Sequence, residues 1–157
     1  MDKIKTTEGD LIVRDARFAI VATRFNEFIV ASLIKGAVHA LRQHGADDGD
    51  LEIIRVPGAF EMPVAIEKVA ASRRFDGIIA LGAVIRGGTP HFDYVAGECV
   101  KGITAAGQRH GVPIGNGVLT VDTIEQAIER AGTKAGNKGE EATLAVIEMV
   151  NLLRRID

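Results

Sequence analysis

The sequence predicts an α/β fold: a three-layer α-β-α sandwich in which helices cover both faces of a central, four-stranded, mainly parallel sheet. Short apolar runs rich in β-branched residues alternate with segments of helical periodicity, which is typical of right-handed β-α-β crossovers. The runs are apolar at nearly every position, as strands are when helices cover both sides of a sheet. The predicted strands are residues 18–22, 51–56, 77–81 and 112–119.

The predicted helices follow these strands in order. The first begins after Asn26, a candidate N-cap, and keeps the apolar i, i+3, i+4, i+7 spacing until Gly45. Thr123 and Gln126 form a capping-box pattern at the start of a later helix. The helices after the first are expected at residues 59–71, 92–109, 122–131 and 140–154.

Composition indicates one domain with an aliphatic core. Of 157 residues, 46% are hydrophobic but only 4% are aromatic, which argues against base stacking on aromatic platforms. We expect residues 1–157 to form a single domain, with residues 1–14 as an N-terminal extension or an edge strand. The formal net charge is −2, and the sequence contains no block of like charges that would indicate a nucleic-acid or membrane partner.

The cysteine content and the N-terminal region predict a cytoplasmic protein. Cys99 is the single cysteine, so it forms no internal disulfide, and it has no Cys or His neighbour at metal-ligand spacing. We therefore expect a packed thiol, a reducing compartment and no metal. No sustained apolar run precedes Phe18, which excludes a secretory signal or a membrane span there.

The loop after the third strand is a candidate phosphate site. Ligands of parallel sheets bind beyond the carboxyl ends of the strands, and this loop contains Gly87 and Gly88 followed by Thr89. Glycines let the backbone approach a ligand, and the amide groups that begin the next helix favour an anion. The loop matches neither the dinucleotide-binding nor the Walker A pattern. For the glycines alone, a simple turn is the alternative.

His91 follows directly after this loop. Histidine is the side chain that ordinarily titrates near neutral pH, and most histidines in proteins are surface or packing residues. His39, His44 and His110 are interpreted in that way. At the mouth of the loop, His91 could pass protons to and from a bound substrate. The residues alone leave the functional and packing interpretations equally open.

Other strand ends and one polar segment offer weaker signals. Phe25 and Phe60 follow strands, where an aromatic ring could sandwich a flat ligand, although core packing is the commoner role. Glu61 could cap a helix or accept hydrogen bonds from hydroxyl groups. Arg130 and Lys138 flank a glycine-rich segment that is either an anion clamp or a solvated connection between two helices.

Several of these segments resemble the 6,7-dimethyl-8-ribityllumazine synthase family of riboflavin biosynthesis. The resemblance runs from about Gly9 to the C-terminus. The family condenses 5-amino-6-(D-ribitylamino)uracil with 3,4-dihydroxy-2-butanone 4-phosphate, releases phosphate and water, and uses no metal or redox cofactor. The matching stretches are FAIVATRFNEFIV (18–30), VPGAFEMPVA (56–65), ALGAVIRGGTPHFDYVA (80–96) and EQAIERAGTKAGNKGEEA (125–142).

The resemblance implies roles at the phosphate end of the site. His91 matches the catalytic histidine of the family and would act as general acid and base. Gly88 and Thr89 match its phosphate-side loop. Arg130 matches its phosphate-binding arginine, whose planar fork can bind two oxygens at once.

The resemblance also implies residues around the pyrimidine. Phe25 resembles the aromatic that stacks on the ring, and Ala59–Glu61 resembles the segment that holds the uracil and ribityl groups. Lys138 and Glu141 match polar positions near the phosphate site. The strand end whose backbone reads the edge of the heterocycle comprises Ala83, Val84 and Ile85.

Asn116 departs from the commonest family pattern. Many relatives carry phenylalanine at this position of the fourth strand and some carry asparagine. Hydrogen bonding therefore replaces stacking on this side, and ligand affinity and product inhibition are expected to differ.

The family assembles from rings of five subunits, and the glycine-rich segment 132–139 resembles members whose pentamers form an icosahedral shell. The resemblance therefore implies a homopentamer, possible shell assembly and a possible association with riboflavin synthase. The alternatives are a non-catalytic lumazine- or flavin-binding protein and a purely structural shell subunit; His91 and Arg130 argue against the first. Without the resemblance, a flavodoxin-like or phosphosugar-binding module would be the first choice.

Overall fold

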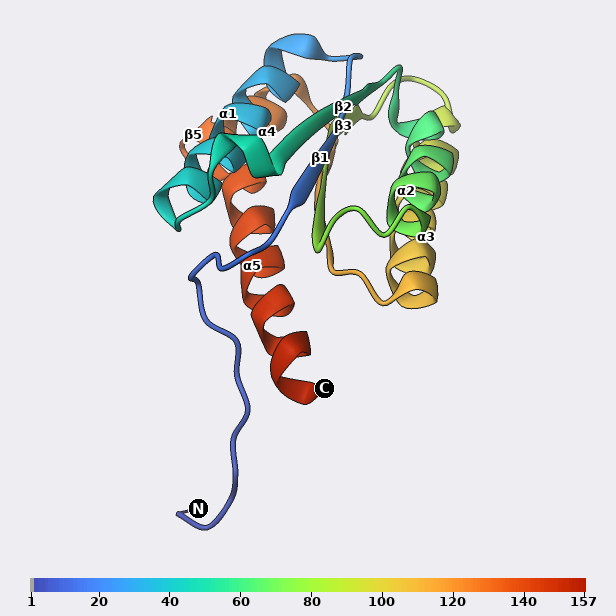
Figure 1. Ribbon diagram of the computed structural model, residues 1–157. Coiled ribbons are helices and arrows are strands. Elements are labelled where there is room, and N and C mark those ends of the chain that lie inside the picture. The colour runs from blue at the N-terminus through green and yellow to red at the C-terminus, as the bar shows by residue number, and fades with distance from the viewer. Residues whose placement is uncertain (1) are drawn as a thin grey trace.

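A computed structural model describes residues 2–157 and contains one four-stranded sheet between two layers of helices (Figure 1). The strand order is β2-β1-β3-β4, and each neighbouring pair is parallel. The predicted three-layer α/β fold, with the flavodoxin-like arrangement of a parallel sheet between helices, is confirmed. The strands are β1 (Phe18–Thr23), β2 (Leu51–Val56), β3 (Gly77–Ile85) and β4 (Ile114–Val121).

The helices divide between the two faces of the sheet. One layer contains α1 (Glu27–Gln43), α4 (Ile124–Glu129) and α5 (Lys138–Ile156), and the other contains α2 (Met62–Ala71) and α3 (His91–His110). Alternate residues of β1 serve the two cores: Ile20 packs in the cluster with α1 and α5, and Val21 packs in the cluster with α2 and α3. Both are fully buried, which explains why the strand is apolar from Phe18 to Ala22.

Several predicted boundaries were wrong: β4 lies two residues later than predicted, α5 extends two residues further at each end, and two further differences affect the site. β3 does not end at Leu81 but continues to Ile85, because Ala83, Val84 and Ile85 pair with Leu119, Thr120 and Val121 of β4. The predicted helix over residues 122–131 is shorter, since Thr123 has an extended backbone and the helix begins at Ile124. The capping box of Thr123 and Gln126 is confirmed.

Asn26 occupies the predicted N-cap position of α1, but its side chain does not cap the helix. Asn26 precedes α1 with a left-handed backbone (φ 65°), and its side chain makes no cap hydrogen bond. Instead, Asn26 Nδ2 donates to the carbonyl of Ala83 at 2.9 Å. The side chain thus ties the β1–α1 turn to the end of β3.

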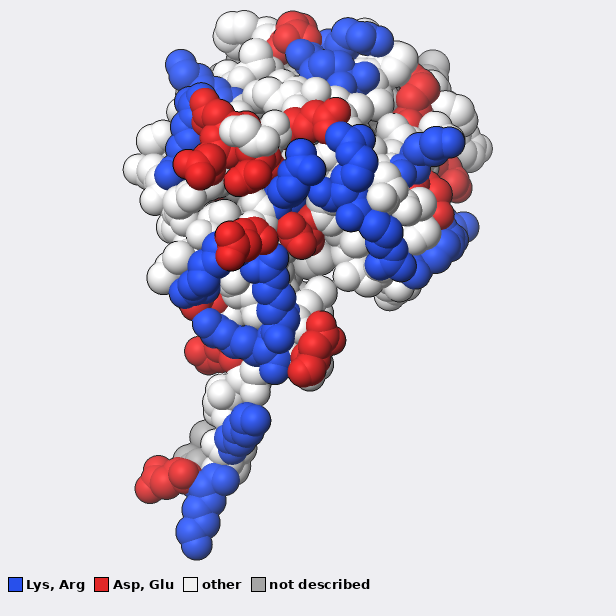
Figure 2. All heavy atoms as spheres, viewed as in Figure 1, with Lys and Arg blue, Asp and Glu red and all other residues white. Residues whose placement is uncertain are grey.

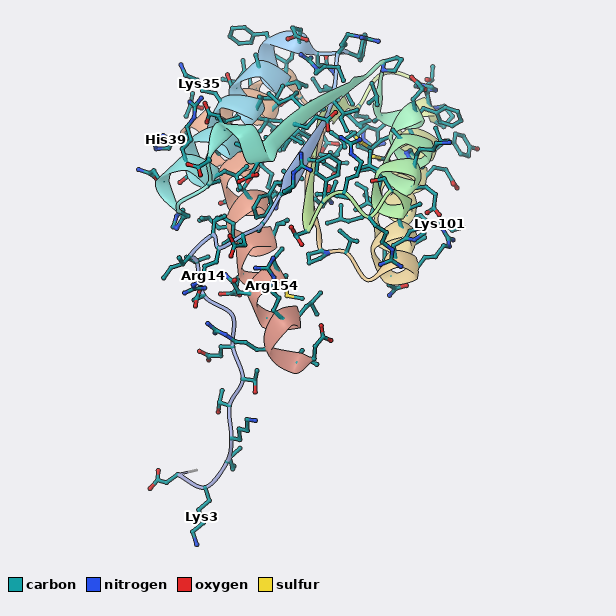
Figure 3. All side chains as sticks on the ribbon, viewed as in Figure 1. Lys3, Arg14, Lys35, His39, Lys101 and Arg154 are labelled. Carbon is teal, nitrogen blue, oxygen red and sulfur yellow. The ribbon has the colours of Figure 1, made fainter. Side chains whose placement is uncertain are left out.

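The N-terminal segment passes along α5 and then leaves the body of the domain (Figure 1). Residues 2–14 belong to no helix or strand. Asn151 of α5 donates to the carbonyl of Asp10 at 2.8 Å, and Arg154 donates to the carbonyl of Arg14 at 2.6 Å. Figure 3 shows Arg14 and Arg154 close together where the segment meets α5.

The surface carries interspersed charges (Figure 2). Many of them pair locally; Arg42, for example, donates to Asp48 through Nε at 2.8 Å and Nη2 at 2.9 Å. Lys35 and His39 project outward from α1 (Figure 3). Within residues 2–157, none of the helices is long and apolar enough to cross a membrane.

Candidate active site

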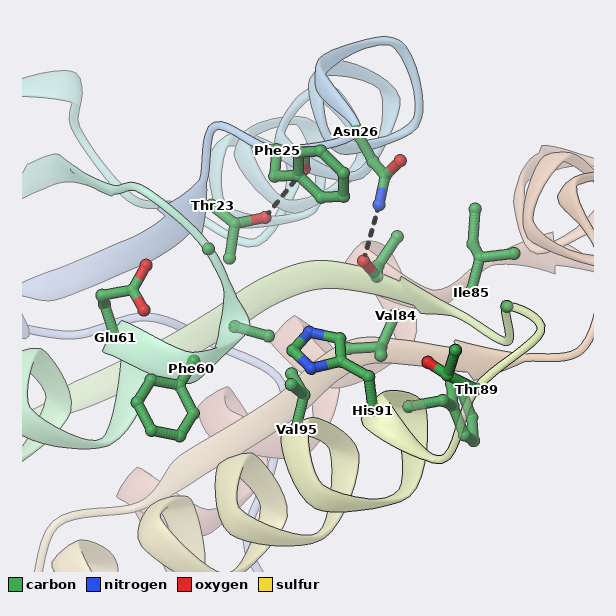
Figure 4. Close-up of a pocket in the computed structure, with 15 residues that line it drawn as sticks. Thr23, Phe25, Asn26, Phe60, Glu61, Val84, Ile85, Thr89, His91 and Val95 are labelled. Carbon is green, nitrogen blue, oxygen red and sulfur yellow. Dashed lines mark hydrogen bonds between the residues drawn. The ribbon is translucent and has the colours of Figure 1, made fainter.

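A cavity with a volume of about 660 Å³ lies at the carboxyl ends of β1 and β3 (Figure 4). Its walls are the β1–α1 turn, the short 3-10 helix η2 (Ala59–Glu61), the end of β3 and the start of α3. This is the edge of the sheet where parallel strands place ligands. The predicted site residues that line it are Phe25, Ala59, Phe60, Glu61, Ala83, Val84, Ile85, Thr89 and His91.

Two phenylalanines stand at this cavity with their rings largely in solvent. Phe25 is 72% exposed and Phe60 is 65% exposed, so neither is a core residue. The turn that carries Phe25 is well held, because its amide donates to the carbonyl of Pro57 at 3.0 Å and its carbonyl accepts from Thr23 Oγ1. A fixed aromatic ring left open to solvent can stack on a flat ligand.

The glycine-rich loop leads directly into α3. Helix α3 begins at His91, and Pro90 occupies the N-cap position without a side-chain cap bond. The amide of Asp93 in this turn donates to the carbonyl of Pro90 at 3.1 Å, so the amides of His91 and Phe92 are the ones available to an anion beside Thr89. Gly87 lines the cavity, whereas Gly88 does not, and a Cβ on either glycine would meet no atom within 4 Å. Figure 4 shows the imidazole of His91 projecting from this first turn into the cavity.

A second cavity, of about 380 Å³, lies beside β4 and the start of α5. It contains the remaining predicted residues Asn116, Arg130, Lys138 and Glu141. Asn116 is exposed on β4, and its side-chain oxygen accepts from the amide of Val118 at 3.1 Å.

A small hairpin brings these polar residues together. The sequence between α4 and α5, interpreted as an anion clamp or a solvated connection, forms the antiparallel strands β5 (Ala131–Thr133) and β6 (Gly136–Asn137). Gly132 and Gly136 have φ values of 109° and 78°, which side-chain-bearing residues rarely adopt. The amide of Lys138 then donates to the carbonyl of Arg130 at 2.9 Å. The hairpin therefore places the first turn of α5 beside the end of α4.

Arg130 is oriented within this second cavity. Its Nη1 donates to the carbonyl of Gln126 at 3.0 Å and lies 3.7 Å from Oε2 of Glu129. Asn137 caps α5 by accepting from the amides of Gly139 and Glu140. The cavity thus combines the cations of Arg130 and Lys138 with the carboxylate of Glu141, and the guanidinium of Arg130 is the group in it that best suits an anion.

The two cavities share no lining residue. The structure thus brings together the residues predicted for the pyrimidine and the proton transfers, but it leaves Arg130 and Asn116 in a separate pocket. Sequence reasoning missed some residues that line the first cavity. For Asn26, the position directly after Phe25 was the available signal, but it was interpreted only as a cap. The other missed residues are Thr23, Gly58, Phe92 and Val95, whereas Gly87 lies in the loop predicted as a phosphate site.

Cys99 and the acidic residues offer no further reactive centre. Cys99 is fully buried, and burial raises the pKa of its thiol to about 11. This suits the packed role expected for it. Across residues 2–157, His, Cys, Asp and Glu side chains form no group of three that could hold a metal ion.

Comparison with known proteins agrees with this geometry. A sequence model of the family described as 6,7-dimethyl-8-ribityllumazine synthase matches residues 15–154. A 6,7-dimethyl-8-ribityllumazine synthase of Halorhodospira halophila is 59% identical over 155 residues, which cover 98% of this chain and 99% of that protein. The chain therefore belongs to the 6,7-dimethyl-8-ribityllumazine synthase family, and it is an enzyme of the lumazine-forming step of riboflavin biosynthesis.

Proposed function

We propose that the first cavity binds the ribitylaminouracil substrate and that His91 is the general acid and base of the reaction. The observation that carries this proposal is the combination of exposed Phe25 and Phe60 with an imidazole and a phosphate-type loop around one cavity. The aromatic rings suit the flat pyrimidine. Glu61 lies at the same wall and suits the hydroxyl groups of the ribityl chain.

The reaction requires repeated proton transfer. The aromatic amine of the pyrimidine adds to the ketone of the butanone phosphate, and loss of water gives an imine. A proton bound to carbon then leaves as phosphate is eliminated, and the resulting enol tautomerises to a new carbonyl. The ribitylamino nitrogen closes the ring on this carbonyl with loss of a second water. A single imidazole can accept and return the proton in each step, which commonly accelerates a step by roughly 10²- to 10⁴-fold.

The phosphate of the second substrate is assigned to the loop that precedes α3. Gly88, Thr89 and the first-turn amides provide neutral donors at this place. A dianionic group needs a positive charge as well, and Arg130 is the family's candidate. Lys138 and Glu141 lie beside Arg130 in the second cavity. Because Arg130 lies in a cavity separate from the loop, one chain alone does not complete the proposed site.

We further propose that the second cavity of one subunit completes the first cavity of its neighbour. Such a contact is heterologous, and repeated heterologous contacts close into a ring. A homopentamer is the ring that the family resemblance implies. Packing of pentamers into an icosahedral shell, and association with riboflavin synthase, are proposed on the resemblance of the segment 132–139 alone.

The test of the proposed function is direct. Purified protein is incubated with both substrates, and the fluorescence of the lumazine product and the release of inorganic phosphate are followed together. Equal amounts of both products support the proposal. Tight binding of lumazine without turnover would instead identify a binding protein on this fold.

A further inference from the structure

Arg86 adjoins residues of both cavities, because Ile85 and Gly87 line the first and Val121 lines the second, but Arg86 itself lines neither. It directly follows β3, and its amide donates to the carbonyl of Val121 at 2.8 Å. Its Nε donates to Asp122 Oδ1 at 2.9 Å, and its Nη1 lies 3.5 Å from Asp93 Oδ1. The guanidinium carbon also lies 4.4 Å from the centre of the Phe92 ring. One side chain thus contacts two separate segments of the chain.

The first of these segments carries the proposed general base. Phe92 and Asp93 belong to the first turn of α3, which begins at His91, and Phe92 itself lines the first cavity. A shift of this turn would move the imidazole and the amide groups that face the phosphate.

The second segment leads to Arg130. Asp122 is the residue between β4 and the capping box of α4, and its amide donates to Gln126 Oε1 at 2.7 Å. Gln126 in turn presents its carbonyl to Arg130 Nη1. Asp122, the partner of Arg86, is therefore hydrogen-bonded to the same residue, Gln126, that orients Arg130 in the second cavity.

The loop between Arg86 and α3 has little else to hold it. Neither Gly87 nor Gly88 has a neighbour within 4 Å of where a Cβ would lie. Glycine loses more conformational freedom on ordering than any other residue, so an untethered loop would lose affinity when a ligand orders it. A contact at each end of the loop lowers this cost.

The charges around Arg86 agree with a role in positioning. Hydrogen bonding to Asp122 and the nearby carboxylate of Asp93 raise the pKa of the Arg86 guanidinium above its usual value. Two carboxylates already engage this one cation, so Arg86 offers little free charge to a phosphate. The side chain is 45% exposed, and an exposed ion pair alone stabilises a protein weakly. The contribution of Arg86 is instead to fix the relative positions of Asp122, Asp93 and Phe92, because its guanidinium is planar and contacts all three.

We propose that Arg86 is a positioning residue that holds the Gly87–Pro90 loop and the first turn of α3 in their ligand-binding geometry by tying them to the β4–α4 junction. The inference rests on the proposed function, because the ligand is the butanone phosphate assigned to this loop. A positioning role and a direct phosphate-binding role for Arg86 predict different effects of substituting Asp122.

Kinetics of matched variants separate these two roles. Arg86→Gln keeps part of the aliphatic stem and loses the charge. We expect this variant to raise KM for the butanone phosphate about tenfold and to lower kcat. Its KM for the pyrimidine should change less than about twofold. Asp122→Asn should change KM in the same direction, and the double variant should be no worse than Arg86→Gln, because both remove one contact. The control Arg42→Gln breaks the comparable exposed pair with Asp48 at the end of α1 and should leave both KM values unchanged.

A lower KM for the butanone phosphate in Asp122→Asn would overturn the proposal, because it would mean that freeing Arg86 improves direct binding to phosphate. Equal changes in both KM values for Arg86→Gln would also overturn it, since a general structural effect does not select one substrate.

Amide hydrogen exchange tests the tether without turnover. In the unliganded protein, Arg86→Gln and Asp122→Asn should each exchange faster over residues 87–93, with unchanged exchange in α5, and Arg42→Gln should match the wild type. Wild-type exchange in both site variants would overturn the tether even if the enzyme is fully active. A wild-type protein that makes no lumazine would instead contradict the proposed function. The hydrogen-exchange result would then still show whether Arg86 holds the loop.

Discussion

Co-assembly of two variants with low activity at subsaturating butanone phosphate tests whether neighbouring subunits share the site. His91→Ala removes the proposed general base from the first cavity, and Arg130→Ala removes the guanidinium from the second. If one site uses both residues from different subunits, a mixed ring contains some interfaces where both are intact.

The expected recovery follows from counting interfaces. In equal mixtures, about half of the subunits retain His91 and the other half retain Arg130, so about one quarter of randomly formed heterologous interfaces join the two intact residues. His91→Ala alone should lose roughly 10²- to 10⁴-fold in turnover. The mixture should therefore exceed that parent by about 25-fold or more, and reach about a quarter of wild-type activity per site.

The assay refolds the two proteins together at several ratios and measures lumazine formation, with mass spectrometry to verify mixed oligomers. Activity should peak at equal amounts. A matched control mixes wild-type subunits with the double variant His91→Ala/Arg130→Ala. If neighbouring subunits share the site, activity should fall with the square of the wild-type fraction. If each chain contains a whole site, activity should fall in proportion to the wild-type fraction. Verified mixed oligomers without recovery, together with a proportional control, would refute the shared site.

Three single substitutions test the individual roles. His91→Ala should lower kcat by roughly 10²- to 10⁴-fold with a much smaller effect on substrate binding, and unchanged kcat in steady-state assays would remove His91 from the chemistry. Arg130→Ala should weaken binding of the butanone phosphate by about 1.5–3 kcal/mol, measured by titration calorimetry, because a charge-assisted contact is lost; equal loss for both substrates would indicate misfolding instead. Asn116→Phe should keep turnover and change the Kd of the pyrimidine, since a stacking ring replaces an amide; an inactive variant would show that the amide has a different role.

The layers of the fold could be predicted because the two central strands, β1 and β3, are buried along nearly their whole length and are therefore apolar. The local sequence does not show where β3 ends, since Gly82 follows the predicted end at Leu81. A Cβ at Gly82 would lie 3.0 Å from Thr23 Cγ2 on the neighbouring strand, so this glycine allows close packing within the sheet and does not form a turn. Such a contact depends on which strands are neighbours, and a single run of sequence does not contain that information.

The hairpin between α4 and α5 was missed for a different reason. Its strands, β5 and β6, have three and two residues, which is too short for an alternating pattern to be visible. The segment was recognised as glycine-rich, but the positive φ values of Gly132 and Gly136 were not predicted. Similarly, the sequence around Asn26 indicated a cap and did not reveal the true partner of its side chain, because Ala83 lies 57 residues away.

The first cavity could be predicted more completely than the second. Phe25, Ala59–Glu61 and His91 each follow a strand, and the carboxyl ends of parallel strands meet at one edge. Asn116 lies within β4, and Arg130 follows the next helix, so this rule does not place them in the same cavity. Only the family resemblance connected them to the reaction, and the structure of one chain keeps them apart.

The separation of the two cavities also explains an apparent cost in the first. Phe25 and Phe60 are mostly exposed, although burial of such a side chain contributes about 1.5–3 kcal/mol. Imine formation and phosphate elimination proceed best in a site from which water is excluded, and a cavity with open aromatic walls does not exclude it alone. Closure by a neighbouring subunit would bury these rings and bring Arg130 to the phosphate in the same step. A ring can close in this way only if the two half-sites of each chain keep a fixed relation, and Arg86, which contacts α3 and the β4–α4 junction at once, provides one such connection.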